Sequence, residues 1–420
     1  MAQKRQLSML CLLYAPLLFS GCGGGAPSAG LSGTPTPTPS PTPNPTPTNT
    51  VVWKTSISAE QSPNILGLNL VGANVFGVGV VTHPGVDQSA YAAVVTDNGA
   101  TAAAGPTNSL PESGDMNGAA IVNSTTALAV GRDTPAGSTT STAALFTLNP
   151  GNAGFLTQKP IQCPSFGNTV DATAIALDGS TAYVALAVKG ADPVIVKADT
   201  AGNVSCTQTP IDVPQGNTNG VVHKILVTAD SLFVGGEFLS PGGVLQGFVV
   251  RLDKATGNQI WAPVFGGRPV ASIAFDAAGA LYVGETKLDV QPHSWFIEKF
   301  TPPFTVTSTA SWSKQGIAPA AATTQNTLIG IFVRQDGNIV AAGFVTPAGT
   351  DTAAVQTAFA VLDPATGATS ASSALTIFPG DREHMGSAFL SGNNLYVAGQ
   401  KFTPGVANSF NTWFAKLGTQ

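Results

Sequence analysis

The chain has 420 residues, of which 10% are charged and 43% are hydrophobic, and its formal net charge is −5 at pH 7. An acidic chain with so few basic residues has no basic face for nucleic acid, so we expect no nucleic-acid partner. The 47 glycines are typical of a β protein with many tight turns rather than of a disordered chain.

The N-terminus combines positive charge with a short apolar stretch. Lys4 and Arg5 precede the apolar run 7–19, which is too short to cross a bilayer as a helix and ends at the letters S-G-C. This pattern predicts a signal peptide over residues 1–21. The small residues before Cys22 resemble a bacterial lipobox, which implies that Cys22 is acylated and begins the mature chain. An ordinary cleaved secretion signal is the alternative.

The residue after Cys22 indicates where the protein is expected to be located. A glycine there, in place of aspartate, resembles lipoproteins sent to an outer membrane. The resemblance implies a cell-envelope protein at the outer membrane or cell surface, with lipid on Cys22 as its membrane anchor.

The sequence predicts a tether over residues 22–50. Positions 34–50 are T-P-T-P-T-P-S-P-T-P-N-P-T-P-T-N-T, in which almost every second residue lacks an N–H group and has a fixed φ. Such a segment forms neither a helix nor a ladder strand, so we expect a disordered, extended linker. At about 3.1 Å per residue, it would hold the folded domain on the order of 50 Å from the membrane.

The remaining residues, 51–420, contain a short phrase that recurs seven times. Its clearest form is L-Y-V-A-G, and the copies lie at 75–79, 127–131, 182–186, 232–236, 281–285, 339–343 and 395–399. A period of roughly 50 residues, built from short apolar runs and Gly/Asn/Asp turns, is typical of β-propeller blades. The sequence therefore predicts an all-β, seven-bladed β-propeller.

The seventh repeat ends after its third strand. The segment V-V-W-K-T at 51–55 precedes the first repeat, and Trp53 matches Trp261 and Trp312 of the outer strands. We expect this segment to pair with the last blade and close the ring, because an open ring would leave unpaired strand edges. Deleting residues 51–57 is then expected to destabilise the whole domain.

Two stretches carry a resemblance to a known family. Residues 252–261, L-D-K-A-T-G-N-Q-I-W, and more weakly 362–368, resemble the repeats of quinoprotein-like propellers. The pattern is also similar to short propeller repeats of bacterial secreted proteins. The cofactor-binding members normally have eight blades and a quinone pocket, whereas this sequence has seven repeats and no matching pocket motif. We predict no cofactor, and the resemblance implies a structural role for Trp261.

The mature domain contains two cysteines, Cys163 and Cys206, in a compartment that permits disulfides. Aligning 156–164 with 206–214 places Cys163 seven positions beyond the equivalent of Cys206, near the opposite end of a strand. The sequence leaves open whether they pair, because a bridge needs a short Cα separation.

Ionisable residues are scarce, and many of them fall on one expected face. The loops between second and third strands, and those leading to each inner strand, open on the face that bears all four histidines, at positions 83, 223, 293 and 384. Our candidate ligand-binding residues at the mouth of the central channel are Asp171, His223, Arg268, Asp381, Arg382, Glu383 and His384. Solvated polar loops are the plainer interpretation. On the opposite face, Asp97, Asp178, Asp230, Asp253, Asp336 and Asp363 are expected to cap tight turns.

No local motif identifies a reaction. The sequence lacks G-x-S-x-G, H-E-x-x-H, a Walker loop and C-x-x-C, and the 381–384 cluster matches no metal-ligand spacing. The leading hypothesis is a non-enzymatic binding or scaffold module for a protein or polysaccharide partner. The alternatives are a polysaccharide hydrolase or lyase using a carboxylate pair such as Asp171 and Glu383, a quinoprotein-like oxidoreductase, and a surface-assembly component.

Overall fold

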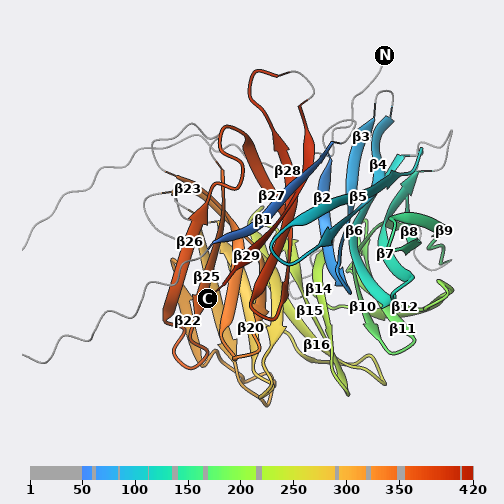
Figure 1. The fold of residues 1–420 in the computed structure, drawn as a ribbon. Coiled ribbons are helices and arrows are strands. Elements are labelled where there is room, and N and C mark those ends of the chain that lie inside the picture. Colours follow the sequence, from blue (N-terminus) through green and yellow to red (C-terminus); the bar gives the residue numbers. More distant parts are fainter. Residues whose placement is uncertain are drawn as a thin grey trace, which may run out of the picture. The chain divides into compact units, whose positions relative to one another are not determined.

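The computed structural model describes residues 50–58, 63–83, 86–111, 113–134, 141–163, 169–213, 220–288, 293–317, 323–347, 355–406 and 409–419. The signal sequence, Cys22 and the Thr/Pro segment up to residue 49 lie outside the described residues. The described part forms strands and turns arranged as seven antiparallel sheets (Figure 1).

Blades 1 to 3 each have four strands in chain order from the channel outward. They are β2 (Asn64–Val71), β3 (Asn74–His83), β4 (Val86–Asp97) and β5 (Ala102–Ser109) in blade 1; β6 (Ser113–Asn123), β7 (Thr126–Thr134), β8 (Thr142–Asn149) and β9 (Gly154–Pro160) in blade 2; and β10 (Thr169–Asp178), β11 (Thr181–Val188), β12 (Val194–Asp199) and β13 (Val204–Pro210) in blade 3.

Blades 4 to 7 keep the same order, except that the outermost strand of blade 7 is the first strand of the chain. They are β14 (Val221–Val227), β15 (Ser231–Leu239), β16 (Leu245–Asp253), β17 (Gln259–Trp261) and the short β18 (Val264–Phe265) in blade 4; β19 (Val270–Phe275), β20 (Leu281–Lys287), β21 (Ser294–Phe300) and β22 (Trp312–Gln315) in blade 5; β23 (Thr323–Val333), β24 (Ile339–Pro347), β25 (Gln356–Leu362) and β26 (Thr369–Leu375) in blade 6; and β27 (Arg382–Ser391), β28 (Asn394–Phe402), β29 (Asn411–Gly418) and β1 (Val51–Ser58) in blade 7.

The inner strands of consecutive blades contact one another around a complete ring. β2 contacts β6, and the contacts continue through β10, β14, β19, β23 and β27 back to β2. The chain therefore folds as a seven-bladed β-propeller, which confirms the fold predicted from the seven repeats.

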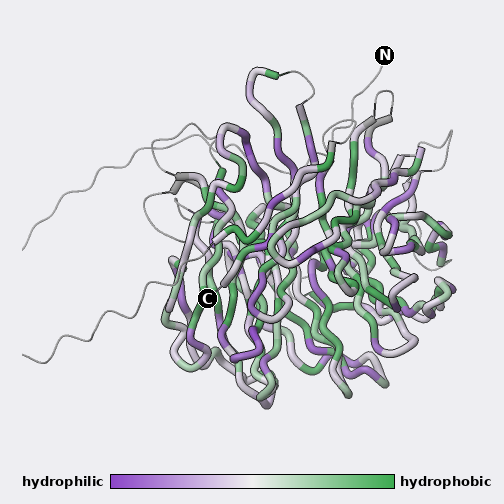
Figure 2. Tube along the Cα trace, in the orientation of Figure 1, coloured by the Kyte–Doolittle hydropathy of each residue, from purple (hydrophilic) through white to green (hydrophobic). Residues whose placement is uncertain are grey.

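The hydrophobic core is divided among the interfaces between neighbouring blades. One cluster joins Leu128 and Leu145 of blade 2 to Val184 and Val196 of blade 3, and all four are at most 1% exposed. Figure 2 shows hydrophobic residues spread along the strands rather than gathered in one patch. Each blade therefore depends on its neighbours to cover its apolar faces.

The glycine of the repeated phrase has a steric role. Every inner strand carries a β-bulge, and opposite it, in five of the seven second strands, the chain has glycine. A Cβ on Gly79 would lie 1.9 Å from the carbonyl oxygen of Asn64, and the same clash would arise at Gly131, Gly236, Gly343 and Gly399. Glycine at these positions lets the bulged inner strand approach the second strand.

The ring closes through β1, as the sequence predicted. β1 pairs antiparallel with β29, with Trp53 opposite Lys416. The carboxylate of Asp97 in blade 1 accepts hydrogen bonds from Trp53 Nε1 (2.9 Å), Tyr396 Oη (2.7 Å) and Lys416 Nζ (3.0 Å) of blade 7. We call these four residues the closure clamp. It ties three strands of the last blade to the first.

Blade 5 repeats three of these residue types at its contact with blade 6. Tyr282, Lys299 and Trp312 place their polar atoms near the carbonyl oxygen of Pro364, and the Lys299 Nζ distance is 2.8 Å. A second-strand Tyr, a third-strand Lys and a fourth-strand Trp thus form a recurring device for joining neighbouring blades.

Candidate functional site

The channel mouth is lined by the bulges of the inner strands. The residue skipped in each strand register forms what we call the bulge ring: Leu66, Asn117, Thr173, His223, Ala271, Ile329 and Gly386. Its members on blades 2 to 4 are polar, and the other four are apolar or lack a side chain. Hydrogen-bonding groups are therefore gathered on one side of the mouth.

A buried pair of carboxyl groups lies beside this polar side. Asp115 of β6 and Asp171 of β10 occupy equivalent positions, two residues before the bulges of neighbouring blades. Asn117 Nδ2 donates to Asp171 Oδ1 at 2.9 Å and lies 3.5 Å from Asp115 Oδ1. Arg132 Nη2 donates to Asp115 Oδ2 at 2.6 Å. The Asn117 amide thus lies between Asp115, which pairs with the Arg132 guanidinium, and Asp171, which has no salt bridge among the described residues.

The environment makes these two carboxyl groups chemically different. Burial, helped by the charge of Asp115, raises the pKa of Asp171 to about 8. Burial also raises the pKa of Asp115, but the Arg132 guanidinium opposes this. Near neutral pH, Asp171 therefore carries the proton of the pair, whereas the Arg132 guanidinium favours the ionised form of Asp115. Such a pair can donate one hydrogen bond and accept others from a ligand.

His223 continues the polar side into blade 4. Its Nε2 lies 3.4 Å from Oε2 of Glu237 on β15. Burial favours the neutral imidazole, but the Glu237 carboxylate outweighs it and raises the pKa of His223. The next residue, Lys224, is exposed, and burial lowers the pKa of its amine. Lys224 and Glu237 were not among the predicted site residues, because neither belongs to a sequence motif.

Arg268 lies in an internal charge cluster of blade 5. Its Nη1 is 3.0 Å from Glu285 Oε2 and 2.8 Å from Glu298 Oε1, and its guanidinium stacks 4.2 Å from the Phe296 ring centroid. Glu285 is 0% exposed and stands where five other blades have the bulge-facing glycine. Burial raises its pKa well above the ordinary value. Arg268 is therefore held largely by the protein, with 19% of its side chain exposed.

The sequence cluster 381–384 has its side chains engaged in separate contacts. Asp381 pairs with Lys401 and accepts from Thr403 Oγ1, whereas Glu383 is 2% exposed and accepts from the Phe378 N–H. Successive residues of a strand point to opposite faces, so density in sequence does not bring groups together.

The other two members of this cluster contact aromatic rings. The guanidinium of Arg382 lies 5.4 Å from the Phe402 ring centroid, and the ring of His384 lies 4.8 Å from that of Phe344. Burial raises the pKa of Glu383 to about 7 and lowers that of His384. Of the seven candidates, Asp171 and His223 lie on the polar side of the mouth, and the others have contacts of their own.

The opposite face contains carboxylates that serve the fold. Asp253 Oδ1 accepts from the N–H groups of Ala255 and Thr256, and Asp363 caps the equivalent turn of blade 6. Hydrogen bonds to the turn lower the pKa of both. The predicted turn-capping role is confirmed for Asp253 and Asp363, and the raised carboxyl pKa values gather at the channel mouth.

Cys163 and Cys206 form a disulfide, which the sequence had left open. Their Cα atoms are 5.4 Å apart, and the bridge links the segment after β9 to the outer strand of blade 3. Aligning the repeats compares the position of each cysteine within its own repeat. The disulfide instead joins consecutive blades, and such an alignment does not show their proximity.

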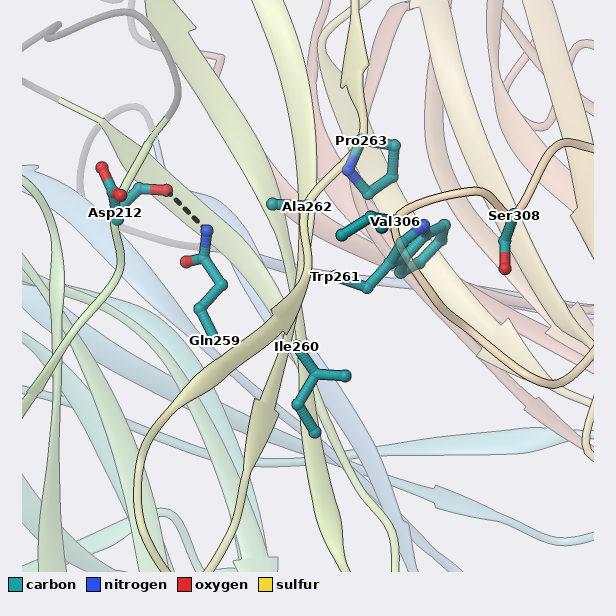
Figure 3. A pocket seen from close by; sticks show the side chains of 8 residues that line it. All are labelled: Asp212, Gln259, Ile260, Trp261, Ala262, Pro263, Val306 and Ser308. Atoms are coloured by element: carbon teal, nitrogen blue, oxygen red, sulfur yellow. Dashed lines mark hydrogen bonds between the residues drawn. The ribbon is translucent and has the colours of Figure 1, made fainter.

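An open groove of about 390 Å³ lies at the outer edge of blade 4 (Figure 3). Gln259 Nε2 donates to the Asp212 carbonyl oxygen at 3.2 Å on one side, and Trp261, Pro263 and Val306 gather on the other. Trp261 is only 3% exposed, so its ring offers little surface for stacking. The groove is a weaker candidate than the mouth.

Among the residues that the structure describes, no helix has the length and apolarity needed to span a membrane. Nor do these residues bring together three or more His, Cys, Asp or Glu side chains in a way that could hold a metal ion.

Comparisons with known proteins bear on the fold. No family model matches the sequence, and no curated protein matches it. Similar solved structures include a polysaccharide lyase, Uly1 (TM-score 0.53, 9% identity, 87% of this chain and 99% of that chain). BamB from Moraxella catarrhalis gives 0.42 and 13%, with the same coverage, and Chaetomium thermophilum Sqt1 gives 0.48 and 12%, covering 87% and 98%. At 9% identity, the similarity to Uly1 bears on the fold alone.

Proposed function

We propose that this chain is a lipid-anchored, extracytoplasmic β-propeller that binds a polysaccharide or protein partner at its channel mouth. The observation that carries this is the polar side of the bulge ring, where the Asn117 amide donates to Asp171 and burial raises the pKa of Asp171 to about 8. A ligand site requires convergent polar groups on a rigid scaffold, and perturbed pKa values mark such sites. The lipobox-like Cys22 and the Thr/Pro segment support the anchored location.

The binding role is tested with the full-length chain and two variants. Asp171→Asn combined with Asn117→Ala alters the mouth, and Asp230→Asn alters an exposed turn of the opposite face. We expect the double variant to lose at least tenfold in affinity for a panel of oligosaccharides or for a protein captured from its own envelope, while Asp230→Asn binds like the wild type. Equal binding by all three proteins contradicts the proposal.

The anchor is tested separately. Cys22→Ser should move the protein from the membrane fraction to the soluble fraction of cells that produce it. An unchanged distribution contradicts acylation at Cys22.

A second candidate, polysaccharide cleavage, is favoured by the unequal pair Asp115 and Asp171. A proton-bearing acid beside an ionised one is the arrangement that general acid–base chemistry needs. If the wild-type chain releases shorter fragments from a polysaccharide and Asp171→Asn does not, the chain is an enzyme rather than a binding module.

A further inference from the structure

One long side chain interrupts a ring of small residues in the channel. The position directly after each bulge is glycine, alanine or serine in six blades, namely Gly67, Gly118, Ala174, Ser272, Gly330 and Ser387. In blade 4 it is Lys224. These small residues allow close contact between inner strands, since a Cβ on Gly67 would lie 3.0 Å from the Gly118 Cα.

The Lys224 ammonium has no hydrogen-bond or ion-pair partner among the described residues. The neighbouring carboxylate, Glu237, is engaged by His223 at 3.4 Å. The side chain is exposed to solvent, yet burial lowers the pKa of its amine. Both features fit an amine that projects into a space enclosed by protein.

The surrounding charges leave that amine without compensation. In blade 3, Asp171 bears a proton near neutral pH, and in blade 4 His223 and Glu237 form a pair. In blade 5, Arg268 pairs with Glu298 and with Glu285; burial raises the pKa of Glu285 well above its ordinary value, so the charges of Arg268 and Glu298 balance each other. The described ionisable groups of this part of the mouth therefore leave one positive charge without a partner, which suits one negative charge on a ligand.

We propose that Lys224 is an anion-binding residue of the central channel and that it binds the carboxylate of an acidic polysaccharide. This inference rests on the proposed binding function and specifies its ligand. A polysaccharide is favoured over an acidic peptide because polar side chains accompany Lys224 on this side of the mouth: His223 precedes it in blade 4, and Asp171 and Asn117 belong to blades 3 and 2. Peptide partners usually require a buried aromatic or aliphatic anchor, whereas sugar hydroxyls require donors and acceptors.

The test uses calorimetric titration of the full-length chain with trigalacturonate and with the neutral trimer maltotriose. Lys224→Gln removes the charge, and Lys189→Gln is the matched control, because Lys189 is an exposed lysine between the second and third strands of blade 3. We expect trigalacturonate to bind at least tenfold more weakly to Lys224→Gln than to the wild type or to Lys189→Gln, and its binding to the wild type to weaken with added salt. Trigalacturonate should also protect Lys224 from acetylation, measured by mass spectrometry.

The contrary results separate this inference from the proposed function. If maltotriose binds as well as trigalacturonate and both depend on Asp171 and Asn117, the mouth binds sugars but the anion assignment is wrong. If a triglutamate peptide binds in a Lys224-dependent way and trigalacturonate does not, the ligand class is wrong. If no sugar responds to any mouth variant, the inference is wrong as well, and the proposed function is left with only a protein partner.

Discussion

The closure clamp gives the sharpest prediction about stability. Asp97 is 9% exposed at its side chain, and it accepts from Trp53, Tyr396 and Lys416. Asp97→Asn keeps the shape but removes the charge and presents an NH₂ group to these donors. Hydrogen bonds to charged groups contribute about 1.5–3 kcal/mol each, and breaking a buried ion pair costs about 3–5 kcal/mol. We expect the free energy of unfolding to fall by about 3 kcal/mol.

The pH dependence of this effect has a defined sign. Although burial opposes it, the hydrogen bonds from Tyr396 and Lys416 hold the pKa of Asp97 below its ordinary value. A lowered pKa in the folded state stabilises the protein above the unfolded pKa, and that contribution is lost as the pH falls through the folded pKa. The difference between wild type and Asp97→Asn should therefore be full at pH 7 and shrink below about pH 4.

The assay is urea unfolding followed by tryptophan fluorescence, with Asp363→Asn as control. Asp363 caps a turn within blade 6 through Ala365 and Thr366, so its loss should cost less. A double-mutant cycle with Lys416→Met should show a coupling, because each change removes the same ion pair. The reasoning is refuted if Asp97→Asn costs no more than Asp363→Asn, or if its effect adds to that of Lys416→Met.

Three further predictions concern the bulges, the acid pair and the disulfide. Gly79→Ala places a Cβ 1.9 Å from the Asn64 carbonyl oxygen and should lower the free energy of unfolding in urea by about 1–3 kcal/mol. A Cβ on Gly266 would have no atom within 4 Å, so Gly266→Ala should leave this free energy nearly unchanged. Equal effects of the two substitutions would contradict the steric role. Asp171 has a folded pKa of about 8, above the unfolded value, so its protonation favours the folded state at low pH and its contribution is lost as the pH rises. Asp171→Asn should therefore gain stability relative to wild type between pH 4 and pH 8, by at most about 1.4 kcal/mol per unit, and a difference independent of pH would argue against it. Replacing Cys163 and Cys206 by Ser should lower the stability by about 2–4 kcal/mol, and a reducing agent should destabilise the wild type but not this variant in thermal unfolding.

The fold could be predicted from the sequence because each blade repeats the same sequence pattern. The L-Y-V-A-G phrase combines the apolar second strand with the glycine that faces a bulge, and Trp53 shares its residue type with Trp261 and Trp312. A short strand before the first repeat and a missing one after the last left a single way to close the ring.

The candidate site was harder to predict from the sequence, because its side chains come from different blades. Asp115 and Asp171 are far apart in sequence and meet through equivalent positions of neighbouring inner strands. Aligning the repeats at their bulges would have revealed the pair. Lys224 would have appeared in the same alignment as the one long side chain among small residues. The 381–384 cluster is dense in sequence, but its four side chains make separate contacts in the structure.

The way the ring closes also dictates when the protein can finish folding. β1 is synthesised before every other strand of the propeller, whereas its partner β29 is made after all the rest. Bringing Val51 to Leu417 across so long a loop costs about 5 kcal/mol of chain entropy, which must be met before the pairing forms. Until then both strands expose unpaired edges, so the newly made chain passes through a period in which it can associate with other copies or be captured by chaperones.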